Sequence, residues 1–221
     1  MISPLLANLF LHYALDLWIQ RTYPHVPFAR YADDCVIHCR SEAQAQKIMR
    51  EIGQRLSQCG LALHPEKTKI VYCKDKSRKR YYPQVQFDFL GYRFQPRQIK
   101  TRYGTFSLSF TPAISDKAAK SIRHTIRQWK THRWTQLSIE ELADSFNPVL
   151  RGWINYYGQF YRSKLSPVLG QLDYALVRWA TRKFKRVRSH KKARAWLRRI
   201  IQQQPCLFAH WQITFATMAK R

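Results

Sequence analysis

The sequence predicts an α+β fold: a half that mixes helices with antiparallel strands, residues 1–112, is followed by an all-helical half, residues 113–221. Two observations support this division. In the first half, helical spacing of apolar residues is interrupted by short alternating segments, such as the one formed by Phe106, Leu108 and Phe110. From Ser115 onward the apolar spacing is helical only.

The chain opens with a predicted helix in which Ser3 is the N-cap and Pro4 is the first helical residue. Apolar residues recur on one face, which suits a helix packed against a core. This face consists of Leu6, Leu9, Tyr13 and Leu17. Polar residues interrupt the apolar run and no basic segment precedes it, so it reads neither as a signal sequence nor as a membrane span.

A second helix is predicted over 41–59, with Ser41 and Gln44 as a capping box and Gly60 as its stop. Its core stripe is Ala45, Ile48, Met49, Ile52 and Leu56. Beyond it the pattern predicts further strands separated by a solvated basic loop. These are a strand, a turn and a strand over 61–72, the loop over 74–80, and strands over 86–94 and 106–110.

The second half is predicted to contain a series of amphipathic helices. Ser138 and Glu141 form a capping box for one of them, and Ser166-Pro167 is expected to open another. The apolar stripes are Ala118, Ile122, Ile126 and Trp129, then Leu142, Phe146, Val149 and Leu150, then Leu169, Leu172, Leu176 and Ala180.

The charge balance points to a polyanionic partner. Thirty-nine Lys and Arg stand against thirteen Asp and Glu, which gives a formal net charge of +26. Self-repulsion of that size opposes folding, and the many aromatic residues can stack on bases, so nucleic acid is a better partner than a membrane. A ribosomal or chromatin protein would fit the charge equally well.

The five cysteines are odd in number, and their spacing matches no zinc site. We interpret them as reduced, small apolar residues and expect an intracellular, cytoplasmic protein.

The sequence Tyr31-Ala32-Asp33-Asp34 lies between two runs with strand character, 26–30 and 35–40, which predicts a tight hairpin. Two adjacent carboxylates repel each other at such a turn, where Asn-Gly or Asp-Gly is usual. A hard divalent cation resolves this conflict, because Mg²⁺ prefers carboxylate oxygens and shares its shell with phosphates. The pair predicts a metal site for phosphoryl transfer, and a solvated Asp-Asp turn is the alternative.

Several further segments match, in order, the motifs of one known family. They are Ile2-Ser3-Pro4-Leu5-Leu6-Ala7-Asn8, Tyr31-Ala32-Asp33-Asp34, Gly60-Leu61 to Lys67-Thr68, Phe89-Leu90-Gly91-Tyr92, Phe146-Asn147-Pro148 with 151–157, and 196–211. On these segments the chain resembles the C-terminal part of a group II intron-encoded reverse transcriptase and maturase. The resemblance implies a partial right-hand polymerase palm over 1–112, followed by a helical thumb or maturase domain over 113–221.

The resemblance also implies RNA-directed DNA synthesis with Mg²⁺ as cofactor. Asp33 would bind the metal directly and Asp34 would assist, while Lys67 would face the triphosphate or protonate pyrophosphate unless it is a solvated turn lysine. The residues expected near primer, template or nucleotide are Ser3, Pro4, Tyr31, Ala32, Leu90 and Gly91. The implied partners are intron and template RNA, primer or target DNA and, if the palm is completed, deoxynucleoside triphosphates.

The match to the family pattern is incomplete. A palm carries a further catalytic aspartate upstream of the Ser-Pro motif, and this chain starts inside that motif. Asp16 is not a substitute, because it lies within a predicted helix, where we interpret it as a salt-bridging surface residue. We therefore expect a truncated protein that holds Mg²⁺ poorly and is inactive as a polymerase by itself.

The helical half contains a long basic run with almost no acidic balance, which favours phosphate binding over a merely solvated helix face. Its candidate RNA-binding residues are Arg182, Lys183, Lys185, Arg186, Arg188, Lys191, Lys192, Arg194, Arg198 and Arg199. Arg151, Asn155 and Tyr156 are further candidates. Trp153, Tyr157 and Phe160 recur at helical spacing and are predicted core residues.

Three functional readings remain open. The first is a fragment of a reverse transcriptase. The second is a splicing maturase that binds RNA without polymerase activity, or a decayed remnant of one. The third, a basic scaffold with an accidental Asp-Asp turn, is disfavoured by several motifs in the right order.

Overall fold

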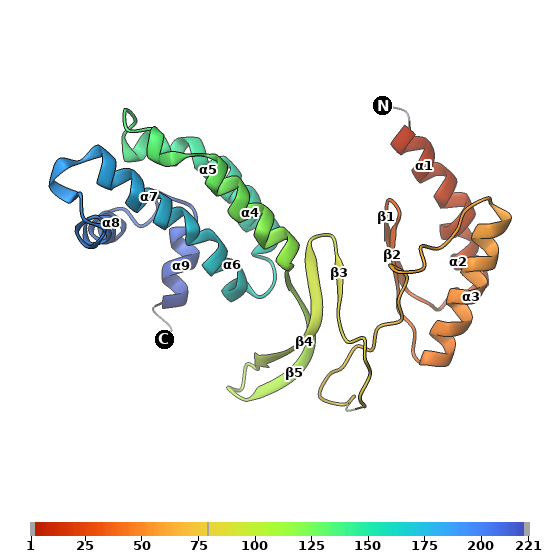
Figure 1. Ribbon diagram of the computed structural model, residues 1–221. Coiled ribbons are helices and arrows are strands. Elements are labelled where there is room, and N and C mark those ends of the chain that lie inside the picture. Colours follow the sequence, from red (N-terminus) through yellow and green to blue (C-terminus); the bar gives the residue numbers. More distant parts are fainter. Residues whose placement is uncertain (1–2, 79, 219–221) are drawn as a thin grey trace. The chain divides into compact units, whose positions relative to one another are not determined.

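The computed structural model of the protein describes residues 3–78 and 80–218, with only the backbone of 215–218. Ile2 of the Ser-Pro motif and Lys79 of the basic loop lie outside the described residues. Helices and two antiparallel sheets combine, as the predicted α+β class requires (Figure 1). Within the described ranges, no helix is both long enough and apolar enough to cross a bilayer.

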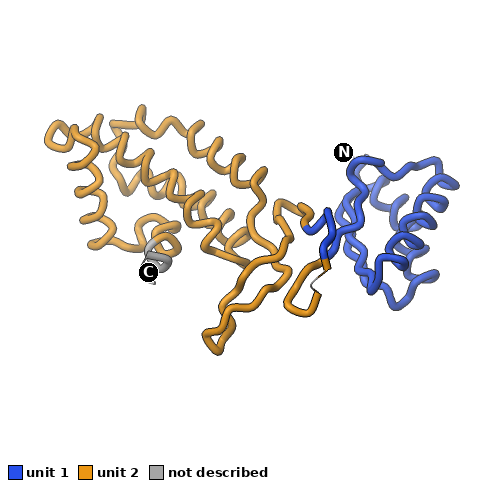
Figure 2. The backbone as a smooth tube through the Cα atoms, turned by 60° about the horizontal axis from the view of Figure 1, so that its bottom comes forward, with its two compact units in different colours: residues 1–72, 81–85 blue, residues 73–80, 86–221 orange. Residues whose placement is uncertain are grey.

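Two compact units make up the chain (Figure 2). Unit 1 consists of residues 1–72 and 81–85, and unit 2 of residues 73–80 and 86–221. Residue 112, where the sequence pattern changes, lies inside strand β5 (Phe106–Ile114). The C-terminal end of this strand joins the helical core through buried Ile114, so the second sheet belongs with the helices.

Unit 1 packs helices on a two-stranded sheet. Its elements are α1 (Ser3–Leu11), the π-helical turn η1 (His12–Asp16), α2 (Leu17–Thr22), β1 (Phe28–Tyr31), β2 (Asp34–Ile37) and α3 (Glu42–Gln58). The core brings η1 and α2 against α3 through Leu15, Ile19, Ile48, Ile52 and Leu56. The Ser41 hydroxyl accepts a hydrogen bond from the Gln44 amide, which confirms the predicted N-cap of α3.

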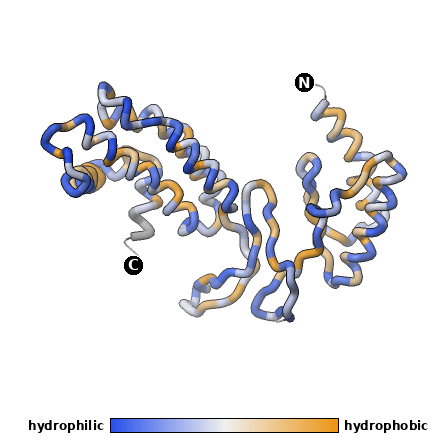
Figure 3. Tube along the Cα trace, in the orientation of Figure 1, coloured by the Kyte–Doolittle hydropathy of each residue, from blue (hydrophilic) through white to orange (hydrophobic). Residues whose placement is uncertain are grey.

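The predicted core face of the first helix is wrong. Leu6, Leu9 and Tyr13 are exposed, whereas Leu15 and Ile19 are buried. The π-helical turn η1 holds more residues per turn than an α-helix, so it rotates the apolar stripe onto a different face. Helix α1 remains apolar along its length (Figure 3). Ser3 is the first residue of α1 rather than its N-cap.

The two strands predicted over 61–72 are not present. Residues 61–78 and 80–86 contain neither helix nor strand. The Thr68 amide donates to the His64 carbonyl at 2.9 Å, which closes a local turn after Pro65. The Tyr72 amide donates to the Gln84 carbonyl at 2.8 Å, but this hydrogen bond is not continued into a β-ladder by the neighbouring residues. The turn satisfies some of the backbone hydrogen-bonding groups of this segment. The alternating apolar residues therefore do not form strands of a sheet.

In unit 2 the sheet has the antiparallel order β3-β4-β5, formed by β3 (Phe87–Phe89), β4 (Tyr92–Lys100) and β5. The single strand predicted over 86–94 is wrong, because Leu90 and Gly91 form a two-residue turn between β3 and β4. Both have positive φ, +50° and +77°, which matches the right-handed twist of a tight hairpin. A Cβ on Gly91 would approach the Tyr157 hydroxyl to 2.9 Å, so only glycine fits.

Helices form the rest of unit 2. They are α4 (Asp116–Gln128), the 3₁₀ turn η2 (Thr131–Arg133), α5 (Ile139–Tyr157), α6 (Arg162–Leu169), α7 (Gln171–Lys183), the 3₁₀ turn η3 (Lys185–Val187), α8 (His190–Gln203) and α9 (Trp211–Met218). The capping box of Ser138 and Glu141 is confirmed at the start of α5. Ser166-Pro167 lies inside α6 rather than at a helix start, because the break before α7 falls at Gly170.

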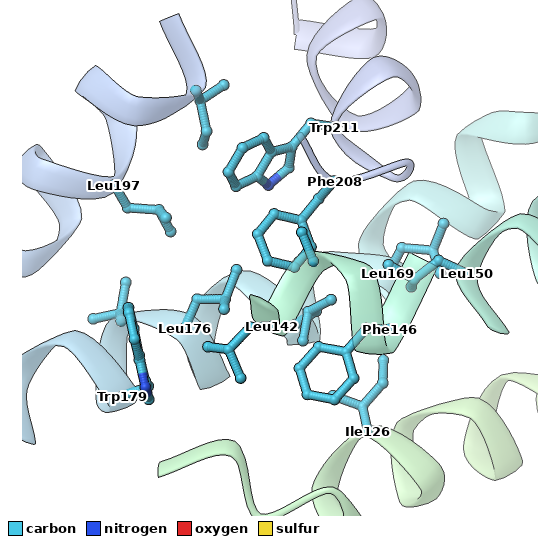
Figure 4. Packing of buried hydrophobic residues seen from close by; sticks show 14 of the residues in the cluster. Ile126, Leu142, Phe146, Leu150, Leu169, Leu176, Trp179, Leu197, Phe208 and Trp211 are labelled. Atoms are coloured by element: carbon cyan, nitrogen blue, oxygen red, sulfur yellow. The ribbon is translucent and has the colours of Figure 1, made fainter. Parts of the chain in front are cut away.

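The core of unit 2 joins these helices, and Figure 4 shows Phe208 and Trp211 beside Leu142, Phe146 and Leu176. Buried Asn147 fastens the segment before α9. Its side-chain amide donates to the Leu207 carbonyl, and its side-chain oxygen accepts from the Ala209 amide, both at 2.9 Å. Asp173 accepts hydrogen bonds from the ring nitrogens of His210 and Trp211. The C-terminal segment is therefore an integral part of the core.

Candidate nucleic-acid interface and metal-binding turn

The Asp-Asp motif forms the predicted hairpin in unit 1. Strands β1 and β2 pair with Tyr31 opposite Asp34, so Ala32 and Asp33 make a two-residue turn. Ala32 has a φ of +52°, a left-handed conformation that is costly for a residue with a side chain. Such a conformation persists only when the surroundings hold it in place.

Arg30 provides that support. Its guanidinium donates to the Ala32 carbonyl at 2.8 Å and to the Asn8 side-chain oxygen at 3.0 Å. The same group binds both carboxylate oxygens of Asp16 at 2.7 Å. One residue therefore links the turn to helix α1 and to the π-helical turn η1. We call Arg30, Asp16 and Asn8 the turn clamp.

The ion pair of the clamp is largely shielded from water, with Arg30 and Asp16 side chains 11% and 14% exposed. The hydrogen bond from Arg30 lowers the pKa of the Asp16 carboxyl below its ordinary value. The same contact raises the pKa of the Arg30 guanidinium. Asp16 pairs with a cation as expected, but the ion pair holds the turn in place and is not a salt bridge on the exposed surface.

Sequence reasoning does not single out Arg30 or Asn8. The sequence signal that could have identified Arg30 is its position on a short predicted strand. A cation that faces inward from such a strand requires a carboxylate partner. Cys35, on the next strand, is no candidate metal ligand or nucleophile, because burial raises its pKa to about 11.

Asp33 and Asp34 are both exposed at the tip of the hairpin. Within the described residues, neither carboxylate has a hydrogen bond or an ion pair, although the chain is strongly basic. Two adjacent oxygen donors with free lone pairs fit the preference of Mg²⁺ for carboxylates. In the part of the chain that the structure describes, however, no three His, Cys, Asp or Glu side chains gather into a group. The turn therefore presents two exposed carboxylates and not a complete set of metal ligands in the described residues.

The other residues predicted near primer or nucleotide occupy several places. Exposed Tyr31 flanks the turn, while Ser3 and Pro4 begin α1 and Lys67 lies exposed in the turn at 65–67. Leu90 and Gly91 belong to unit 2, where their carbonyls accept hydrogen bonds from the Tyr156 hydroxyl and the Ser115 amide. The roles of these six residues stay predictions.

In unit 2 most cations of the basic run are exposed, at the end of α7, in η3 and along α8. Residues 178–199 contain no Asp or Glu. We call the exposed cations of this segment the basic ridge. It consists of Arg178, Arg182, Lys185, Arg186, Arg188, Lys191, Lys192, Arg194, Arg198 and Arg199. The aromatic residues between them, Trp179, Phe184 and Trp196, pack against one another inside the unit.

Lys183 is not among the exposed cations of the ridge, and its role in RNA binding stays a prediction. Its ammonium group donates to the carbonyls of Thr135 and Leu137 and lies 5.4 Å from the centre of the Trp179 ring. These contacts satisfy the charge within the fold. Lys183 therefore holds the segment before α5 against α7.

On α5, the structure separates the predicted RNA-binding residues. Arg151 and Asn155 are exposed as expected. Tyr156 is also exposed, at 47%, but it contacts the β3–β4 turn: its hydroxyl donates to the Leu90 carbonyl at 2.8 Å, and its own carbonyl accepts from Tyr92. Trp153 and Tyr157 pack on the core, whereas Phe160 is half exposed despite its predicted core position.

Comparison with protein-family models gives two matches. Residues 1–94 match the reverse transcriptase (RNA-dependent DNA polymerase) family, and residues 119–199 match the group II intron maturase-specific domain. A search among curated proteins found no match. The two matched regions follow each other in the order expected from the sequence and together cover most of the chain. The chain therefore belongs to the group II intron reverse transcriptase/maturase family.

Proposed function

We propose that the chain binds group II intron RNA through the basic ridge and acts as a splicing maturase. The observation that carries this proposal is a run of exposed cations over 178–199 with no acidic residue to neutralise them. Cations without partners repel one another, and phosphates relieve this repulsion while releasing their own counterions. Arg151 and Asn155 supply further exposed contacts on the same unit.

A polymerase site is the second function that a specific observation favours. We propose that Asp33 and Asp34 hold Mg²⁺ during RNA-directed DNA synthesis, with primer or target DNA and deoxynucleoside triphosphates as partners. When bound, Mg²⁺ supplies charge neutralisation at the reacting phosphate and favours the ionised primer hydroxyl. The turn clamp would keep both carboxylates in one orientation. Lys67 would contact the triphosphate.

The described residues bring only two carboxylates to the turn. A two-metal site needs more negative charge than two side chains provide, so we propose that these 221 residues do not extend a primer by themselves. Primer extension by the purified chain, abolished by Asp33→Asn, would contradict this part of the proposal and leave the RNA-binding part intact.

RNA binding is tested by neutralising the ridge. Changing Arg188, Lys191, Arg194 and Arg198 to glutamine is expected to weaken binding to a transcribed group II intron RNA. Filter binding over a range of KCl concentrations should give a salt dependence whose slope is smaller by about three, because four phosphate contacts are lost. The chain should also accelerate splicing of the precursor RNA, and the variant should not.

A matched control removes the same charge elsewhere in unit 2. Lys117, Lys120, Arg127 and Lys164 are exposed on α4 and α6. Their change to glutamine is expected to alter the salt slope much less. Equal losses in both variants would mean that net charge, and not the ridge, determines binding.

The metal proposal has its own test. Adding Mn²⁺ as a paramagnetic probe to the isotopically labelled chain should broaden the amide signals of the β1–β2 turn first. Changing both Asp33 and Asp34 to asparagine should weaken this binding more than about tenfold, because the charged oxygen donors are lost. Asp144→Asn removes an exposed carboxylate in unit 2 and should leave the turn signals unchanged. Broadening that persists in the double variant would refute the site.

A further inference from the structure

The far end of the β4–β5 hairpin is built as a firm projection from unit 2. In Figures 1 and 2 it extends away from the helices of that unit. The Thr101 amide donates to the Thr105 carbonyl at 2.8 Å, and the Gly104 amide to the Thr101 carbonyl at 3.0 Å. Gly104 has a φ of +81°, as in a hairpin loop closed by a glycine bulge. We call residues 100–106 the hairpin tip.

Two aromatic side chains are displayed on this tip. Tyr103 is 77% exposed and Phe106 is 72% exposed. Large aromatic rings normally gain their stabilisation by burial, and neither ring belongs to a described core cluster. Both rings are therefore largely accessible to a partner.

Basic groups accompany both rings. Lys100 lies directly opposite Phe106 in the register of β4 and β5, so the two side chains share a face. The Arg102 guanidinium carbon lies 4.8 Å from the centre of the Tyr103 ring, and its terminal nitrogen donates to the Tyr103 hydroxyl at 2.6 Å. Stacked aromatic and guanidinium groups of this kind accept both a base and its phosphate.

A second basic segment is fastened to the same hairpin. The Lys76 amide donates to the Leu108 carbonyl at 3.0 Å, two residues from Phe106. This loop, described over 73–78 and at residue 80, also carries Lys74, Arg78 and Arg80. Its one acidic group, Asp75, accepts from the amides of Ser77 and Arg78 and lies 3.8 Å from the Arg78 guanidinium, so the loop keeps a net positive charge. The loop adds positive charge next to strand β5.

We propose that the hairpin tip, with the loop at its side, is a second nucleic-acid site that binds unpaired RNA. Unpaired bases expose the faces that Tyr103 and Phe106 can stack on, whereas a duplex hides them. Lys100, Arg102 and Lys76 supply contacts for the phosphates on either side. A protein partner is less suited, because the two rings are surrounded by cations and form no broad apolar face. The inference rests on the proposed function of unit 2 as an RNA-binding module.

The test compares two variants of the full chain on two RNA probes. The tip variant changes Tyr103 and Phe106 to serine, and the ridge variant is the four-glutamine chain described above. The probes are a fluorescent oligouridylate of about twelve nucleotides and the same strand annealed to its complement. Fluorescence anisotropy gives the dissociation constants. Tyr13→Ser serves as a matched control, because Tyr13 is a similarly exposed ring that lies in unit 1, outside both the tip and the ridge.

We expect the tip variant to bind the unpaired strand at least about fivefold more weakly, since each stacked base contributes that much or more. Its affinity for the duplex should stay within about twofold, and Tyr13→Ser should change neither value. Unchanged affinity of the tip variant for the unpaired strand, with loss in the ridge variant, would overturn the tip site alone. If neither variant loses affinity for either probe, the proposed RNA-binding function fails as well.

Discussion

Replacing Phe208 by alanine is expected to lower the free energy of unfolding of unit 2 by about 3–5 kcal/mol. Phe208 lies in the segment that joins α8 to α9, its ring is fully buried, and the ring centre lies 4.7 Å from that of the Trp211 ring. Its backbone neighbours are held by Asn147, so the segment cannot easily close the cavity. The lost contacts and the remaining void add to each other.

Denaturant unfolding followed by circular dichroism measures this change. Phe106→Ala is the matched control, because the same atoms are removed from a ring on the hairpin tip that is exposed to solvent. We expect this control to change the unfolding free energy by less than about 0.5 kcal/mol. Similar midpoints for both variants would mean that the segment carrying Phe208 is not part of the cooperative core.

Arg30→Leu is expected to destabilise unit 1 by about 3–5 kcal/mol at neutral pH. The substitution leaves the Asp16 carboxylate largely shielded, with the His12 ring nitrogen at 3.5 Å but without its guanidinium partner, and it removes the donor of the Ala32 carbonyl. Hydrogen exchange of the amides in β1, β2 and α3 measures this loss locally. The turn should also lose its fixed conformation, so Mn²⁺ binding at Asp33 and Asp34 should weaken.

The pH dependence distinguishes the ion pair from simple packing. The pKa of Asp16 is lowered in the folded state, chiefly by the hydrogen bond from Arg30. Its contribution to stability is therefore present above the ordinary value of 3.8 and is lost as the pH falls through the lower folded value. In Arg30→Leu this contribution is absent, so the difference between variant and parent should shrink below pH 4.

A double variant, Asp16→Leu with Arg30→Leu, provides the control. Removing both charges should restore part of the stability of the core, since a buried pair can be replaced by apolar residues at little cost. It should not restore metal binding at the turn, because the Ala32 carbonyl still lacks its donor. A double variant as unstable as Arg30→Leu would argue against an unpaired charge as the cause.

Local rules account for much of the fold. Ser41 and the pair of Ser138 and Glu141 cap their helices as predicted, because a capping interaction involves only residues one turn apart. In the predicted stripe of α3, Ile48, Ile52 and Leu56 are buried as their spacing requires, whereas Met49 is exposed. The Asp-Asp hairpin follows from two short strands on either side of a turn.

Other features depend on partners far away in the chain. The π-helical turn shifts the buried face from Leu6 and Leu9 to Leu15 and Ile19, and the spacing of the apolar residues does not predict that shift. Lys183 and Tyr156 are residue types that often bind RNA. In the structure, however, the Lys183 ammonium group donates to a carbonyl 46 residues away, and the Tyr156 hydroxyl donates to a carbonyl 66 residues away. Residue types alone do not reveal such bonds.

The sequence by itself determined the family, the Asp-Asp turn and the excess of positive charge, because motif order and net charge are properties of the chain before it folds. Only the tertiary structure decided which charges are available to a partner. Arg30 and Lys183 are bonded within the protein, whereas Asp33, Asp34 and the cations of the basic ridge are exposed to solvent. The physical reason is that a charge is neutralised by whichever partner the fold brings within hydrogen-bond distance.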